Sequence, residues 1–182
     1  MKTRRYKQLI ITFVLIFSSI HIVNAQQQLQ VSSSERFIAY SLYNFSKLID
    51  WPNSSTATKF QIAIVGDKRV YIELVNLAQN RKVGNASYNI IFYKDITEIS
   101  GYHQIIYLSN QQCGKMDQLN EQSKKGGVLL VTERKGMTRQ GSTISFQTNE
   151  KGTMGFEIAK ENAAKNNLTI KAQLERMAMS VI

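Results

Sequence analysis

The residue types that most often perform chemistry in proteins are scarce in this chain. It contains one cysteine, Cys113, and two histidines, of which His21 lies in an apolar leader and His103 lies in the body of the sequence. His103 and Cys113 have no acidic residue fixed beside them, which is a poor basis for nucleophilic catalysis or metal binding. No glycine-rich phosphate loop, nucleophile elbow or paired-histidine helix occurs in the sequence. We therefore predict a noncatalytic protein with no metal and no cofactor.

The single cysteine also excludes an internal disulfide. Cys113 is then a buried small apolar residue, a free thiol or an intermolecular link, and we favour the inert, buried residue.

A cluster of positive charge follows one of the apolar runs. In "TERKGMTRQG", Arg134, Lys135 and Arg139 surround Met137, and the segment comes directly after a strand that we expect to be buried. Open α/β sheets usually place their ligand sites at the ends of such strands. We predict that these four residues bind an acidic patch of a partner or a small anion, with Met137 as the apolar tip of the loop. The alternative is a basic loop that is only hydrated.

A second candidate site lies at the ends of two other apolar runs. Gly66 and Asp67 follow one run, and Asn110 follows another. If both runs are parallel strands of one sheet, their carboxyl ends form a crevice that also includes Arg134. The alternative function is therefore a module that binds a small ligand.

The first 25 residues have the features of an export signal. Four basic residues precede the apolar run 9–23, and "VNA" supplies small residues at the cleavage position. We predict cleavage after Ala25, which leaves residues 26–182 as a single periplasmic domain. A retained membrane anchor is the alternative, but the 15-residue run is shorter than the roughly 20 residues that span a bilayer.

The net charge becomes modest once the leader is removed. The whole chain carries a formal charge of +10, and the leader holds four basic and no acidic residues, so the mature charge is +6. Such a surplus favours solubility and acidic partners. Without a clustered basic stripe and aromatic platforms it does not indicate nucleic-acid binding.

The first element that we predict after the leader is a helix over 32–50. Its apolar residues have helical spacing, and Ser32 with Glu35 forms a capping box. Pro52 disfavours helical geometry in the residue before it, so we expect the helix to end near Asp50. The neighbouring Trp51 then packs onto the core, and we assign Trp51 and Pro52 a structural role.

Four apolar runs then alternate with helical patterns. The run 62–65 is apolar at four consecutive positions, as in strands that are buried on both faces. Helices are expected between the strands, over 68–80 and 113–125, and a strand, helix and strand in this order imply a parallel pair. The four strands are expected within 60–67, 88–95, 103–110 and 126–133.

The last third of the chain changes pattern. Residues 142–148 and 153–159 alternate apolar and polar positions around "NEKG", which predicts an antiparallel hairpin. A short helix over 160–167, a last strand over 168–172 and a closing helix over 173–182 follow. The fold class is thus α/β, with a mostly parallel central sheet flanked by helices and an antiparallel hairpin in the C-terminal half.

Several of these segments together resemble a known family. The first helix closed by "WP", the strands "FQIAIVGD" and "HQIIYLS", and the tail with "ISF", "GFEI", "NAAKNNLTI" and "LERMA" are similar to the YfiR family of bacterial periplasmic proteins. The resemblance covers nearly all of the mature chain. Where family members commonly carry a cysteine before the middle strand, this chain has His103.

The resemblance implies a function. Its members are compact α/β domains, often dimeric, and the best-known role is to bind the periplasmic sensor domain of an inner-membrane diguanylate cyclase and hold it inactive. Similar domains also occur beside sensor histidine kinases. The expected partner is therefore an inner-membrane signalling protein, and we expect neither nucleic-acid binding nor membrane insertion after the signal is cleaved.

Overall fold

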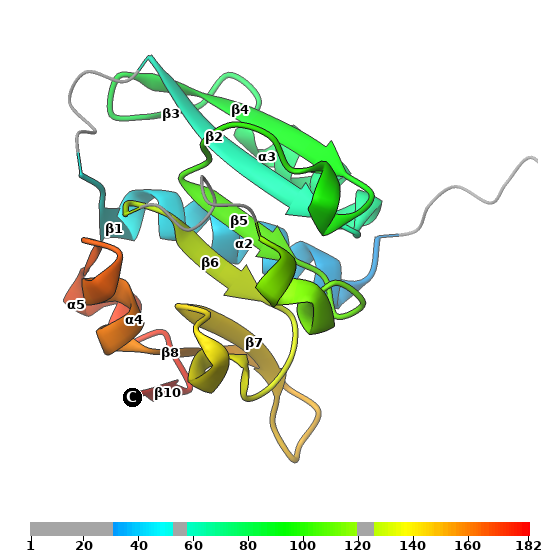
Figure 1. Ribbon diagram of the computed structural model, residues 1–182, viewed down its shortest axis with the longest axis vertical. Helices are drawn as coiled ribbons and strands as arrows, with labels where there is room; N and C mark the ends of the chain where they lie inside the picture. The colour runs from blue at the N-terminus through cyan, green and yellow to red at the C-terminus, as the bar shows by residue number, and fades with distance from the viewer. Residues whose placement is uncertain (1–30, 53–57, 120–125) are drawn as a thin grey trace, which may run out of the picture. The chain divides into compact units, whose positions relative to one another are not determined.

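The structure is a computed structural model that describes residues 31–52, 58–119 and 126–182 (Figure 1). The predicted export signal, residues 1–25, lies outside the described residues. In chain order the elements are α2 (Ser33–Leu48), β1 (Ile49–Asp50), β2 (Lys59–Val65), α3 (Lys68–Ala78), β3 (Lys82–Val83), β4 (Ala86–Tyr93), η3 (Ile96–Glu98), β5 (Ile105–Leu108), η4 (Cys113–Gln118), β6 (Leu129–Thr132), η5 (Met137–Gln140), β7 (Ile144–Thr148), β8 (Met154–Ile158), α4 (Lys160–Lys165), β9 (Thr169–Ile170), α5 (Ala172–Glu175) and β10 (Ser180–Val181). The η elements are 3-10 helices.

The main sheet has the strand order β10-β8-β7-β6-β5-β2-β4-β3. Strands β4, β2, β5, β6 and β7 run parallel to one another, whereas β3 pairs antiparallel with β4, and β7 and β8 form an antiparallel hairpin. In the hairpin Ile144 lies opposite Ile158 and Phe146 lies opposite Phe156, so both pairs point to the core. The predicted fold class, a mainly parallel sheet with a C-terminal hairpin, is confirmed.

The first helix begins as predicted and ends slightly early. The Ser32 N–H donates to Glu35 at 2.6 Å and the Glu35 N–H donates to the Ser32 hydroxyl at 3.3 Å, which is the expected capping box. The helix ends at Leu48 rather than near Asp50. Residues 49 and 50 form β1 instead, which pairs antiparallel with β9 apart from the main sheet.

The two faces of the sheet have different covers. On one face α2 and α3 pack over the sheet, and this core contains Ile38, Leu42 and Phe45 with no exposed surface. Figure 1 shows both helices behind the strands. The other face is covered by the three 3-10 helices, which contribute Ile96 and Cys113 among others. The helical cover of this second face is therefore short and irregular.

One of those 3-10 helices corrects a prediction. The amphipathic α-helix expected over 113–125 is wrong for residues 113–118, which form η4; residues 120–125 lie outside the described part of the chain. Lys115 has φ −108° and ψ 16°, which interrupts the helical geometry. Its ammonium group pairs with the carboxylate of Asp95, which caps η3, and this contact joins η3 to η4.

The end of the chain also differs from its prediction. The closing helix expected over 173–182 is wrong, because α5 ends at Glu175 and β10 then adds to the edge of the sheet. The Met179 N–H donates to the Phe156 carbonyl and the Ile182 N–H to the Ile158 carbonyl, both at 2.8 Å. Leu174 is buried, whereas Met177 is 47% exposed. The short helix α4 is confirmed, and the strand predicted over 168–172 forms β9.

Candidate functional site

The carboxyl ends of β2 and β5 lie side by side in the sheet, and the residues predicted to form a crevice there are occupied by structural contacts. Gly66 has φ +84°, and a Cβ atom there would lie 2.4 Å from the Ser109 hydroxyl and 2.8 Å from the Gln112 side chain. The Asp67 carboxylate accepts hydrogen bonds from the N–H groups of residues 69 and 70, at 2.8 and 3.1 Å, and so caps α3. Little space is therefore left beside Gly66.

Asn110 and Arg134, also predicted at this end of the sheet, bind each other. The Arg134 guanidinium donates to the Asn110 side-chain oxygen at 2.9 Å and to its carbonyl at 2.6 Å. The Glu133 carboxylate accepts from the Asn110 N–H at 3.2 Å and from the Tyr107 hydroxyl at 2.7 Å. These bonds join the end of β5 to the end of β6. Burial, followed by the nearby Glu133 carboxylate, holds the pKa of Tyr107 well above its ordinary value.

The predicted basic loop is exposed except for its apolar member. Arg134, Lys135 and Arg139 are exposed. Met137 is only 3% exposed and packs into the core beneath the 3-10 helices, so it is not the apolar tip of the loop. Gly136 and Gly141 flank η5 with φ +84° and +111°. These turns, which favour glycine, direct Met137 onto the sheet.

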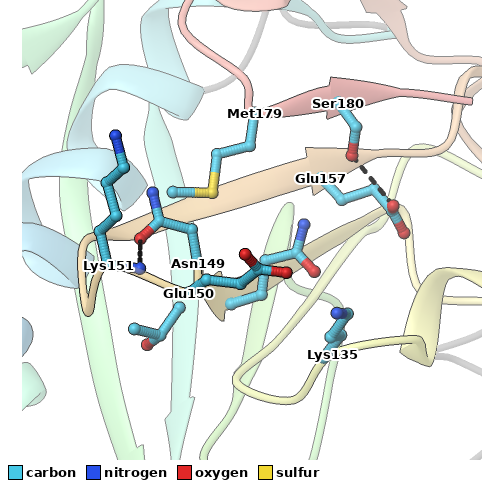
Figure 2. Close-up of a pocket in the computed structure, with 9 residues that line it drawn as sticks. Lys135, Asn149, Glu150, Lys151, Glu157, Met179 and Ser180 are labelled. Atoms are coloured by element: carbon cyan, nitrogen blue, oxygen red, sulfur yellow. Dashed lines mark hydrogen bonds between the residues drawn. The ribbon is translucent and has the colours of Figure 1, made fainter.

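A groove of about 690 Å³ lies beside Lys135 (Figure 2). We call it the C-terminal groove. The hairpin loop between β7 and β8 forms one part of it, and β8 and β10 form another. Its lining residues are Lys135, Gln147, Thr148, Asn149, Glu150, Lys151, Glu157, Met179 and Ser180.

Hydrogen bonds fix much of the polar surface of this groove. The Ser180 hydroxyl donates to one oxygen of Glu157 at 3.0 Å, and the Thr138 hydroxyl donates to the other. The Asn149 side-chain oxygen accepts from the N–H groups of Lys151 and Thr153, at 3.0 and 2.9 Å, which shapes the hairpin turn. The Lys135 and Lys151 ammonium groups make no ion pair with a carboxylate in the described part of the chain, so both remain available to a partner.

Exposed apolar side chains gather next to the C-terminal groove. Of the six large apolar residues classed as exposed among the described residues, four fall in the last six positions: Met177, Met179, Val181 and Ile182, at 47%, 40%, 40% and 54% exposure. Gly155 of β8 provides space for Met179, because a Cβ atom at Gly155 would lie 2.6 Å from the Met179 Cγ atom. A concentration of exposed apolar side chains is typical of sites of protein contact.

Sequence reasoning found one residue of this groove, Lys135, and missed the others. Glu157, Met179 and Ser180 come from segments that the sequence places in a hairpin and a helix. One signal was available, because Met177, Met179 and Val181 alternate with smaller residues. That period of two is typical of a strand.

The side chains with reactive potential lie in the core. His103 is 1% exposed, and its Nε2 atom lies 3.3 Å from the Tyr93 hydroxyl. The Cys113 thiol donates to the carbonyls of Leu108 and Ser109, and burial raises its pKa. Within the described ranges, no three His, Cys, Asp or Glu side chains are arranged to hold a metal ion.

Trp51 and Pro52 follow β1, just beyond the C-terminal end of α2. The Trp51 ring meets that of Phe60 edge-on with centroids 5.0 Å apart, and its indole N–H donates to the Ser46 carbonyl at 3.2 Å. Pro52 approaches Gly127, where an added Cβ atom would lie 2.9 Å from the proline ring.

Comparison with known proteins identifies the family. The family model described as YfiR/HmsC-like matches residues 36–179, and the chain therefore belongs to this family of periplasmic regulatory proteins. No curated protein matches the chain. None of the helices in the described segments is both long enough and apolar enough to cross a bilayer.

One of the solved structures that match the chain is the crystal structure of a conserved domain protein from Vibrio cholerae O1 biovar El Tor str. N16961, with a TM-score of 0.47 and 11% sequence identity. The match covers 80% of this chain and 60% of that protein, so the chain spans less than two thirds of its length.

Proposed function

We propose that this protein is exported to the periplasm, loses residues 1–25 by cleavage after Ala25, and acts there as a noncatalytic regulator formed by residues 26–182. It binds the periplasmic part of an inner-membrane signalling protein and represses it. By family resemblance that partner is a diguanylate cyclase. Membership of the YfiR/HmsC-like family supports the regulatory role.

The observation that carries the proposal is the exposed apolar end of the sheet. Met179 lines a groove that also contains Lys135, and the exposed Met177 and Val181 lie two positions to either side of Met179 in the chain. A methionine that becomes fully buried contributes roughly 1.5–3 kcal/mol. A few such anchors, with a cation at the rim, are enough to dominate the energy of a protein interface. We assign the predicted binding residues Arg134, Lys135 and Arg139 to the rim of this surface.

Repression follows if the surface prefers one conformation of its partner. A bound protein shifts a conformational equilibrium only by the difference between its affinities for the two states. A hundredfold preference for the inactive sensor is about 2.7 kcal/mol. Neither turnover nor a cofactor is needed for this mechanism.

The alternative, a small-ligand module associated with a sensor kinase, has less support. Gly66 is packed against Ser109, and Asp67 and Asn110 already have hydrogen-bond partners. The observations therefore favour protein contact at the C-terminal groove over ligand binding in the crevice.

Site-specific photocrosslinking in the native host tests the proposal. A benzoylphenylalanine at Met179 should crosslink to an inner-membrane protein with a periplasmic domain, and the same group at exposed Lys68 on α3 should not. Deletion of the protein should raise cyclic-di-GMP, and a Met179→Asp/Lys135→Glu variant should fail to restore the low level. The intact mass of the periplasmic protein should correspond to a chain that starts at Gln26.

Three results would contradict the proposal. These are the same crosslinks from positions 179 and 68, cyclic-di-GMP that does not change on deletion, or full repression by the doubly substituted variant when it is folded and exported at the normal level. Circular dichroism of the purified variant checks its folding.

A further inference from the structure

The strand β4 leaves most of one edge without a neighbour. On its inner side it pairs with β2 from Ser87 to Tyr93. On its outer side it pairs with β3 only at Ala86 and Ser87. In the described part of the chain no strand continues β3 along the remaining residues of β4. Figure 1 shows β4 and β3 at the far side of the sheet from β10.

The hydrogen bonds to β2 identify which backbone groups face outward. The Ser87 N–H donates to the Thr58 carbonyl at 3.0 Å, and the Tyr93 carbonyl accepts from the Gly66 N–H at 2.9 Å, both on the side of β2. Backbone groups of successive residues in a strand point alternately to the two sides. The N–H and C=O groups of Ile90 and Phe92 therefore point to the open edge.

This edge has few of the features that protect natural sheet edges. Proteins block edge strands with charged residues, prolines, bulges or very short strands. Residues 86–93 of β4 contain no charged residue and no proline. Ile90, Ile91 and Phe92 are only partly buried. The short β3, with its lysine, covers the first two residues and leaves the rest accessible.

A groove of about 770 Å³ follows this edge on the side of α3. We call it the β4 groove. The Tyr71 ring lies 5.8 Å from the Phe92 ring, and Val75 of α3 is 38% exposed within the groove. It is lined by Tyr71, Val75, Asn76, Ala78, Gln79, Asn80, Arg81, Lys82, Ser87, Tyr88, Asn89 and Ile90.

The charge of the β4 groove has one sign. Its lining includes the cations Arg81 and Lys82 and no carboxylate. Arg81 and Lys47 lie over the ring of Tyr43, at 5.3 and 4.5 Å from its centroid, and their contacts lower the pKa of Tyr43. None of these three cations makes an ion pair with a carboxylate among the described residues. Among the described residues, the positive charge at this end of the groove is therefore not neutralised by a carboxylate.

We propose that the open edge of β4 binds an extended, acidic segment of another protein, which adds to the sheet as a further strand. Its backbone would pair with the outward groups of Ile90 and Phe92. Alternate side chains would enter the β4 groove against Tyr71 and Val75, and carboxylates would meet Arg81 and Lys82. Main-chain pairing supplies affinity in such complexes, and pockets for alternate side chains supply specificity.

A second copy of this chain is a poorer occupant. Two copies paired through β4 would bring two sets of Arg81 and Lys82 onto one surface, and the groove offers no carboxylate to offset them. The proposal is also independent of the function proposed above, because β4 lies near the opposite edge of the sheet from the C-terminal groove.

Selection from a phage-displayed library of random dodecapeptides on the mature protein tests the proposal. Selected peptides should alternate apolar residues and carry carboxylates, and fluorescence polarisation should measure their affinity. Ile90→Pro removes one outward N–H, a change that edge strands tolerate, and should weaken binding at least tenfold. Arg81→Glu/Lys82→Glu should weaken it to a similar degree, whereas Lys68→Glu, a charge reversal at the far end of α3, should leave it unchanged.

Hydrogen exchange distinguishes strand addition from other binding modes. The amides of Ile90 and Phe92 should become slower to exchange when peptide binds, whereas the Ile91 amide, which faces β2, should already be slow. The proposal is overturned if no acidic peptides are enriched, if they bind the folded Arg81→Glu/Lys82→Glu variant as tightly as the parent, or if exchange at residues 90 and 92 does not change. Dimerisation that protects these two amides without peptide would assign the edge to a second copy and would also overturn it.

Discussion

The side chain of Met179 lies directly over the backbone of Gly155. A Cβ atom at residue 155 would approach the Cε, Cγ and Sδ atoms of Met179 to 2.5, 2.6 and 2.7 Å. Gly155 therefore determines where Met179 sits in the C-terminal groove, although Gly155 belongs to β8 and Met179 lies just before β10.

Substitution of Gly155 should disturb the proposed binding surface more than the fold. Gly155→Ala should displace Met179 and cost about 1–3 kcal/mol of unfolding free energy, as overpacking usually does. We expect binding to the signalling partner to weaken at least fivefold. Gly114→Ala is a matched control, because a Cβ atom there meets only the Arg134 guanidinium at 3.8 Å. Equal binding by both variants would show that the position of Met179 does not matter to the partner.

The contact between Asp95 and Lys115 should make stability depend on pH in the acidic range. Hydrogen bonds from Lys115, and then from Thr97, lower the pKa of Asp95 to about 2. A carboxyl group with a lowered folded-state pKa stabilises the protein above its unfolded pKa, near 3.8, and loses this contribution as pH falls through about 2.

Urea unfolding of the parent and Asp95→Asn measures this effect. At pH 6 the variant should be less stable, and the difference should shrink between pH 4 and pH 2. A difference that stays constant over that range would mean that the charge of Asp95 is irrelevant to stability.

His103 should also make the protein less stable as pH falls, but in a range nearer to neutral pH. Burial lowers its pKa, so the folded protein holds the ring neutral while the unfolded chain takes up a proton near pH 6.5. Its contribution is therefore fully present above pH 6.5 and is lost as pH falls below that value. Thermal unfolding from pH 8 to pH 5 should show a steeper loss of Tm in the parent than in His103→Gln. Parallel curves would indicate that another group is responsible.

Trp51 should stabilise the junction between α2 and the sheet. Trp51→Ala removes the contact with the Phe60 ring and the hydrogen bond to the Ser46 carbonyl, and should cost about 2 kcal/mol, less than a fully buried tryptophan. Trp51→Phe keeps an aromatic ring and should recover part of this loss. Because the chain has no other tryptophan, circular dichroism rather than fluorescence must follow unfolding. If Trp51→Ala lost no stability but lost partner binding, the residue would belong to a binding site.

The central strands could be predicted because their signal is local. Residues 62–65 are consecutive apolar positions, and both faces of β2 are indeed buried, with Ile62 and Ile64 toward the α-helices and Ala63 and Val65 toward the 3-10 helices. The capping box at Ser32 is equally local. Such features depend on neighbours within a few residues, which the sequence displays directly.

The end of the chain could not be predicted in this way. The positions of Leu174, Met177 and Val181 suit one face of a helix, and the alternation of Met177, Met179 and Val181 suits a strand equally well. The backbone of β8 decides between them, because the Met179 N–H bonds to Phe156. The spacing of apolar residues within one segment does not show whether that segment pairs with a strand that is distant in the sequence. For the same reason the sequence indicated Lys135 but not Glu157, its neighbour in the groove.

The small sheet of β1 and β9 couples the two ends of the described domain. Residues 49 and 50 find their backbone partners only at positions 170 and 169, more than a hundred positions later. Contacts between residues so far apart in the sequence form late in folding, because closing the long intervening loop costs conformational entropy. If the chain crosses a membrane unfolded, β1 has no partner strand until β9 has also emerged. Helix α2 is therefore incompletely anchored during most of export. In that interval the chain is accessible to chaperones and proteases.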